Sequence, residues 1–112
     1  MPREISIIIV NYNSGELLSN CLASIRRELS IDYEVVVVDN ASTDGSMEQC
    51  AIFQDGERFI FHTLGENLGF AAACNIGANL SSGNILHFLN PDTELNPGAN
   101  GDYLKVIGDP GK

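Results

Sequence analysis

Two short runs of β-branched residues constrain the fold of this chain more than any other feature of its sequence. Ile5–Val10 reads ISIIIV and Glu34–Val38 reads EVVVV, so both faces of each run are mostly apolar. A strand with one face in water alternates apolar and polar residues, whereas a strand inside a parallel sheet is covered on both faces. We therefore expect both runs to be central strands of a parallel sheet with helices on either side.

The segment after the first run has the spacing of a one-sided helix. Its apolar residues recur every three or four positions, which predicts that one face packs on the sheet; these residues are Leu18, Cys21, Leu22, Ile25 and Leu29. Asn13 followed by Glu16 resembles a capping box and predicts where this helix starts. After the second strand, Ser42, Thr43 or Asp44 is expected to cap a short helix that runs through Phe53.

The second half of the chain repeats the pattern of strand and helix. Arg58–Leu64 is less purely apolar, which predicts a third strand nearer an edge, and Ile85–Leu89 predicts a fourth strand. Phe70–Leu80 predicts a helix of small residues that can pack close to the sheet, and Ala99–Ile107 predicts a last helix. This alternation indicates one α/β domain over residues 1–112, with a doubly wound, mostly parallel sheet.

Composition and charge exclude several classes of function. Fifteen acidic residues against six basic ones give a formal charge of −9, so a positive face for nucleic acid is not expected. The sequence contains no apolar run long enough to cross a bilayer and no signal peptide at its start, which favours a cytoplasmic protein. The three cysteines, Cys21, Cys50 and Cys74, fit no metal-binding or redox spacing and are expected to be core residues.

Polar residues follow each predicted strand, and open α/β sheets bind ligands at the carboxyl ends of their strands. In chain order these residues are Asn11, Tyr12 and Asn13, then Asp39, Asn40, Ser42, Thr43 and Asp44, then Glu66 and Asn67, then Asn90, Asp92 and Glu94. Such residues are also common in turns without any ligand. The six cations fall outside these loops, so a phosphate-bearing ligand there would need a divalent metal. Asp92, which follows a proline, is the candidate metal ligand, and Glu94 is expected to be an exposed turn residue.

Other familiar sites are absent from the sequence. There is no GxxxxGK[ST] phosphate loop, no GxGxxG dinucleotide motif and no GxSxG nucleophile elbow. His62 and His87 lie inside predicted strands without zinc-binding spacing, and we interpret them as packed or edge residues.

The motifs at the strand ends resemble those of inverting family 2 glycosyltransferases with the GT-A fold, a Rossmann-like nucleotide-sugar-binding fold. The resemblance extends from Ile5 to about Ile107 and rests on IVNYN, VVDNASTDGS, ENLGFAAACNIG and FLNPDTE in that order. The chain is similar in particular to the N-terminal, donor-binding part of rhamnosyltransferase-like members of this family.

The resemblance implies a role for each matching residue. Val10, Asn11, Tyr12 and Asp39 would form the nucleoside pocket, in which Asp39 accepts hydrogen bonds from a pyrimidine base. Asn67 and Asn75 would be polar positions on the donor side. Asn90-Pro91-Asp92 stands where the family has its DxD motif, and Asn90 replaces the first aspartate. Asp92 would then be the principal ligand of Mg²⁺ or Mn²⁺.

The resemblance also implies the reaction, which is transfer from a pyrimidine-nucleotide sugar to a saccharide or lipid-linked acceptor in cell-surface polysaccharide synthesis. Such an enzyme would work in the cytoplasm or at the inner face of the membrane. The general base is expected beyond Lys112, because Asp102 and Asp109 lie too soon after Asp92.

Two other interpretations of the chain's function remain open. The chain would be a nucleotide-sugar-binding module or truncated relic without catalysis, or a small α/β domain whose partner is another protein. We expect the 112-residue chain alone to be inactive and to form homodimers or aggregates through an exposed sheet edge.

Overall fold

The two β-branched runs form the centre of a parallel sheet, as their composition predicts. In the computed structural model, which describes residues 3–54 and 57–108, β1 (Ile5–Asn11) pairs with β2 (Tyr33–Asp39) along its whole length. The sheet has four strands in the order β3-β2-β1-β4, and every pairing is parallel. β3 (Phe59–Thr63) and β4 (Ile85–Phe88) are the outer strands, which confirms the expected edge position of the third strand.

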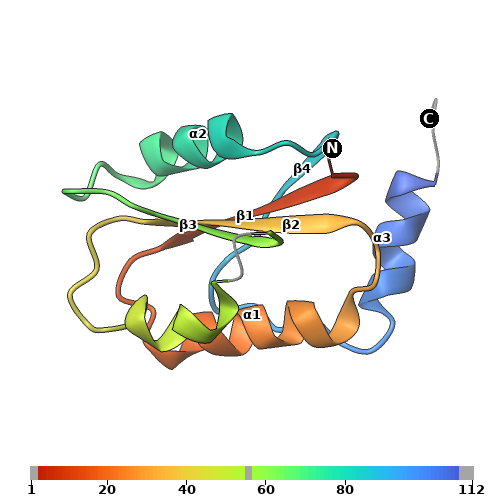
Figure 1. The fold of residues 1–112 in the computed structure, drawn as a ribbon, viewed down its shortest axis with the longest axis horizontal. Coiled ribbons are helices and arrows are strands. Elements are labelled where there is room, and N and C mark those ends of the chain that lie inside the picture. Colours follow the sequence, from red (N-terminus) through yellow and green to blue (C-terminus); the bar gives the residue numbers. More distant parts are fainter. Residues whose placement is uncertain (1–2, 55–56, 109–112) are drawn as a thin grey trace.

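Helices cover the sheet on both faces, and this explains why its central strands are apolar throughout (Figure 1). On one face, α1 (Glu16–Glu28) packs against alternate residues of β1 and β2, which include Ile7, Ile9 and Val35. On the other face, α2 (Phe70–Leu80) packs against the remaining residues of these strands. The structure therefore has the doubly wound α/β architecture that the sequence predicts.

α2 lies close to the sheet because its inner face carries small residues. Ala73 and Gly77 are its buried positions. A Cβ atom at Gly77 would stand 2.6 Å from Ile8 Cγ2 and 3.2 Å from Val38 Cγ2, so a side chain here would push the helix away. The prediction of a helix that packs closely on the sheet is confirmed.

The caps of the first two helical segments differ from the expected ones. Gly15 is the N-cap of α1 and no side chain caps the helix, so the predicted capping box of Asn13 and Glu16 is wrong. The Asn13 side chain instead accepts a hydrogen bond from the backbone N–H of Thr43 at 2.8 Å. The segment through Phe53 is a 3₁₀ helix, η1 (Glu48–Phe53), which begins after Met47 and has no side-chain cap. The proposed caps at positions 42–44 are therefore wrong too, since these residues bond to the loop after β1.

Two further features complete the fold. α3 (Ala99–Ile107) lies beside the end of α1 and the start of β2, where the Asn100 side chain accepts from the backbone N–H groups of Ser30 and Ile31 (Figure 1). Cys21 and Cys50 are buried in the core, as expected, and Cys74 is half-buried. Among the residues described, no helix has the length and apolarity needed to cross a bilayer.

The outer strands carry both histidines. His62 on β3 is exposed, and His87 on β4 is half-buried, with its Nδ1 2.8 Å from the hydroxyl of Tyr103. On β4, the side chains of Leu86 and Phe88 are 42% and 47% exposed. An unpaired edge with exposed apolar residues is a site where chains associate, so a homodimer through this edge stays a prediction.

Candidate functional site

The order of the strands places a topological switch point at the carboxyl end of β1, where open α/β sheets bind ligands in a crevice. From β1 the chain continues to β2 and then to β3 on one side, and afterwards returns to β4 on the other side of β1. This reversal is a topological switch point, at which the loops after neighbouring strands run apart and leave room for a ligand. The loops after β1 and β4 flank this point, and they carry Asn11, Tyr12, Asn90 and Asp92.

Asn11 ends β1 and lies opposite Asp39, the last residue of β2, in the strand register. Its side chain is fully buried, and its amide nitrogen lies 2.8 Å from Asp39 Oδ1, 2.9 Å from Ser46 Oγ and 3.2 Å from Ser42 Oγ. The structure thus brings Asn11 and Asp39 together, and it adds Ser42 and Ser46. Ser42 is one of the polar residues that the sequence places at the end of the second strand, whereas Ser46, which follows it in the turn motif DNASTDGS, was not expected there.

Asp39 is a buried carboxylate, only 2% exposed. Its Oδ1 accepts from Asn11 and its Oδ2 accepts from the backbone N–H of Ser42 at 3.0 Å. Within the described chain no ion pair involves Asp39, so amide donors alone offset the loss of water around its charge. Each carboxylate oxygen can accept a further hydrogen bond from a ligand.

The loop after β2 is fastened to the loop after β1. Asp44 Oδ2 accepts from the backbone N–H of Gly15 at 2.9 Å, and its Oδ1 accepts from that of Ser46 at 3.0 Å. Hydrogen bonds from the side chain and backbone of Ser46, followed by that from Gly15, lower the pKa of Asp44. Asn13 and Ala41 are the described non-glycine residues with positive φ, at 52° and 65°. Strained backbone of this kind is concentrated at functional sites.

One atom at the centre of this network has no partner. Asn11 Oδ1 is buried and accepts no hydrogen bond, and it is the one such side-chain atom found within residues 3–54 and 57–108. A buried acceptor without a donor is costly, and each case in a native structure calls for an explanation. The next residue, Tyr12, is 53% exposed and presents its ring to solvent at the same strand end. The orphan acceptor and the exposed tyrosine belong to successive residues at the end of β1, the edge at which open α/β sheets bind ligands.

The loop after β3 contributes the next predicted residues. Asn67 is exposed, and its side chain accepts from the backbone N–H of Gly69 at 2.8 Å. Asn75 is exposed on α2 and makes no hydrogen bond through its side chain within the described part of the chain. Among the described residues, no hydrogen bond joins Asn75 to Asn11 or Asp39.

The segment after β4 is held against α1. Asn90 accepts a weak hydrogen bond from the Cys21 thiol at 4.0 Å through its backbone carbonyl, and the backbone N–H of Leu95 donates to Ser24 Oγ at 2.9 Å. Asp92 lies between these anchors and is exposed. Asn90 also lines a small cavity of about 110 Å³ together with Val10, so these two predicted residues lie close together.

The carboxyl edge of the sheet offers oxygen ligands for a metal ion. Within residues 3–54 and 57–108, no group of three or more His, Cys, Asp or Glu residues is arranged to hold a metal ion. An exposed carboxylate such as Asp92 fits Mg²⁺ or Mn²⁺ when a ligand's phosphate oxygens complete the coordination. The larger cavity, about 680 Å³, lies between β4 and α3; Glu94 lines it, but none of the residues assigned to the nucleoside, the donor or the metal does.

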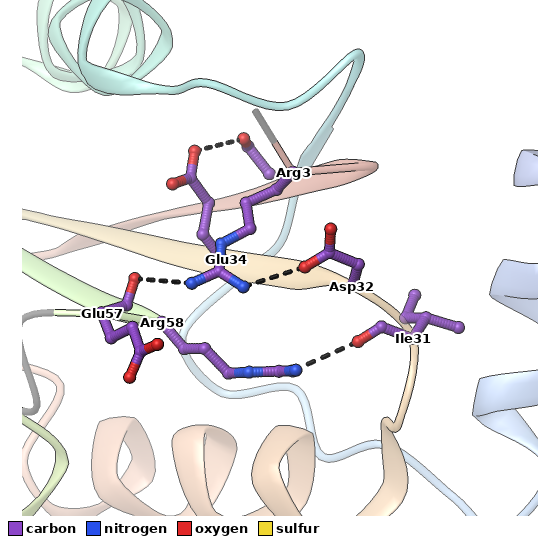
Figure 2. Close-up of polar contacts among 7 residues, drawn as sticks. Arg3, Ile31, Asp32, Glu34, Glu57 and Arg58 are labelled. Atoms are coloured by element: carbon purple, nitrogen blue, oxygen red, sulfur yellow. Dashed lines mark hydrogen bonds and ion pairs between the residues drawn. The ribbon is translucent and has the colours of Figure 1, made fainter. Parts of the chain in front are cut away.

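The two arginines that precede strands lie at the opposite edge of the sheet. Arg3, just before β1, pairs with Asp32 at 2.9 Å and donates to the backbone carbonyl of Glu57 at 3.2 Å; both contacts are drawn in Figure 2. Arg58 precedes β3 and bonds the carbonyl of Ile31 at 3.2 Å. The other described cations lie on α1 and α3, and Lys112 lies outside the described residues. In the described chain the crevice loops therefore contain no cationic side chain, as the sequence predicts.

Comparisons with known proteins point to one family. The model of Glycosyl transferase family 2 matches residues 6–112. The glycosyltransferase GlyA of Streptococcus pneumoniae serotype 4 is 38% identical over 104 residues, which are 93% of this chain and 14% of that protein. A PGL/p-HBAD biosynthesis glycosyltransferase of Mycobacterium bovis is 40% identical over 92 residues, which cover 80% of this chain and 36% of that protein. The chain thus spans a minor part of both relatives.

Solved structures share the fold. TarS of S. aureus (residues 1–349) superposes with a TM-score of 0.83 at 24% identity, over 94% of this chain and 32% of that one. The mannosyltransferase PcManGT of Pyrobaculum calidifontis, in complex with GDP-Man and Mn²⁺, gives a TM-score of 0.82 at 25% identity, over 98% and 34%. The parallel sheet and its helices are those of GT-A glycosyltransferases. By sequence and by fold, the chain belongs to glycosyl transferase family 2.

Proposed function

We propose that this chain forms the donor-binding part of a glycosyltransferase that uses a nucleoside-diphosphate sugar and a divalent metal. The observation that carries the proposal is the set of residues at the switch point. Tyr12, the orphan acceptor of Asn11 and the carboxylate of Asp39 lie on one side, and Asn90 and Asp92 follow β4 on the other. A bound donor would then lie across the switch point, with its nucleoside at the ends of β1 and β2 and its diphosphate near the loop after β4.

The nucleoside side supplies an aromatic ring and hydrogen-bond acceptors. The exposed ring of Tyr12 can stack on a base, while Asn11 Oδ1 and Asp39 can accept from its N–H groups. Val10 and Asn67 would bound the pocket, and Asn75 would face the donor from α2. We propose a pyrimidine base. TarS has been solved with UDP-GlcNAc, whereas PcManGT binds GDP-Man, so a binding experiment has to include both kinds of base.

The diphosphate side requires a metal because the described loops carry no cation. Asp92 would hold Mg²⁺ or Mn²⁺, and Asn90 would contact the donor beside it. When bound, the metal neutralises negative charge on the leaving diphosphate. PcManGT, which was solved with Mn²⁺, supports a metal of this class.

The reaction proposed for the whole protein is a single displacement with inversion. An acceptor hydroxyl oxygen forms a bond to the anomeric carbon, the bond from this carbon to the diphosphate breaks, and a general base takes the hydroxyl proton. The residues described here supply donor binding, and none of them is assigned as the base. A saccharide or lipid-linked acceptor at the cytoplasmic side of a membrane, in cell-surface polysaccharide synthesis, would suit such an enzyme.

Isothermal titration of the purified chain with UDP, dTDP and GDP, each with and without Mn²⁺, tests the proposal. We expect the two pyrimidine nucleotides to bind more tightly than GDP, and only when the metal is present. Tighter binding of GDP would overturn the choice of base alone. An absence of binding by all three nucleotides in Mn²⁺ would overturn the donor site.

A further inference from the structure

Asn40 joins three segments of the chain that are distant in sequence. It follows β2 directly and is 3% exposed. Its backbone N–H donates to the carbonyl of Asn11 at 2.8 Å. Its side chain accepts from the backbone N–H of Leu68 at 3.1 Å and donates to the carbonyl of Gly69 at 3.0 Å. Both polar atoms of the buried amide are thus used to bind the loop between β3 and α2.

This loop has little else to hold it. Residues 65–69 are all exposed, and within the described chain the two bonds from Asn40 are the hydrogen bonds that fasten them to the sheet. Gly69, which Asn40 binds, is the N-cap of α2 with φ 89°, and its carbonyl also accepts from the N–H of Ala73 at 3.2 Å. Gly69 in turn donates to the side chain of Asn67. The position of Asn67 therefore depends on the side chain of Asn40.

We propose that Asn40 is a positioning residue that couples the β3–α2 loop, with Asn67, to the strand ends that carry Asn11 and Asp39. This inference rests on the proposed function, because it concerns the same donor site. Asn40 itself is buried behind the loop and acts through Asn67. If the β3–α2 loop is already ordered before the donor binds, binding does not have to lose the loop's conformational entropy. Asn40 therefore increases the affinity for the donor without contacting it.

The test compares Asn40→Ala, which removes both side-chain bonds, with Asn40→Asp, which keeps an acceptor for Leu68 but places an oxygen against the Gly69 carbonyl. Two controls accompany them. Asn79→Ala removes an exposed amide from α2, and Ile25→Val lowers stability from within the core. For each variant we would measure amide hydrogen exchange at Leu68 and the affinity for whichever nucleotide the wild-type chain binds best in Mn²⁺.

We expect Asn40→Ala to speed exchange at Leu68 and to weaken nucleotide binding by about fivefold or more. Asn40→Asp should weaken binding at least as much as Asn40→Ala, because it sets a buried carboxylate oxygen against the Gly69 carbonyl. Both controls should bind as the wild type does. Faster exchange with unchanged affinity would overturn the proposal while the donor site stands, and so would equal weakening by Ile25→Val. If the wild-type chain binds no nucleotide, the proposed function fails and the coupling fails with it.

Discussion

Replacing Asp39 by asparagine should destabilise the chain, because this carboxylate supports two loops. Its oxygens accept from the side chain of Asn11 at 2.8 Å and from the N–H of Ser42 at 3.0 Å. Asparagine keeps the shape but turns an N–H toward one of these donors, so one of the two hydrogen bonds to residue 39 is lost. Such a loss costs about 2–3 kcal/mol, against a total stability of roughly 5–15 kcal/mol for a domain. Asp39→Asn should therefore fold with reduced stability.

Asp92→Asn is the matched control at the same edge. Asp92 is exposed and forms no hydrogen bond or ion pair within the described part of the chain, so its replacement should change stability by less than about 0.5 kcal/mol. Urea unfolding followed by circular dichroism gives both free energies of unfolding. Equal stability of the two variants would refute the supporting role of Asp39. It would also make loss of binding in Asp39→Asn a direct measure of ligand contact.

Two further predictions concern the packing around glycines and the ionisation of buried thiols. A Cβ atom at Gly83 would stand 2.6 Å from the backbone nitrogen of Ser6, so Gly83→Ala should cost roughly 3 kcal/mol, whereas Gly101→Ala on exposed helix should gain about 1 kcal/mol. Thermal unfolding of the two variants checks the contrast, and a lowered midpoint for Gly101→Ala would contradict it. Burial raises the pKa of Cys21 to about 12 and of Cys50 to about 11, from 9.0. Because the unfolded thiols lose their protons first, the free energy of unfolding should fall as pH rises from about 9 to 12. Urea titrations across this range should show a shallower fall for Cys50→Ala, and an unchanged fall would count against the role of its thiol.

The fold could be predicted from the sequence because the apolar pattern of each segment agrees with its burial in the structure. Runs that are apolar on both faces predict central parallel strands, and the small residues of Phe70–Leu80 predict a helix close to the sheet. The N-caps of α1 and η1 could not be predicted in this way. The sequence pairs Asn13 with Glu16, but the Asn13 side chain bonds to Thr43, and nothing in the spacing of residues indicates which of two loops an asparagine will join.

The candidate site could be predicted in part. Parallel strands place their carboxyl ends at one edge, so Asn11 and Asp39 could be expected there, and the register sets them opposite each other. The pairing of Asn40 with Leu68 depends on the approach of two loops, which the pattern of each loop alone does not encode. The order of the strands, with β4 beside β1, likewise required the structure.

Titration of UDP into the wild-type chain and into Asp92→Asn, with and without Mn²⁺, shows whether the chain binds a nucleotide through a metal at Asp92. We expect saturable binding by the wild type in Mn²⁺, little binding after chelation, and loss of the metal's effect in Asp92→Asn at undiminished stability. Binding that is as tight without metal, or that keeps its full metal dependence in Asp92→Asn, would contradict a metal-dependent donor site at Asp92.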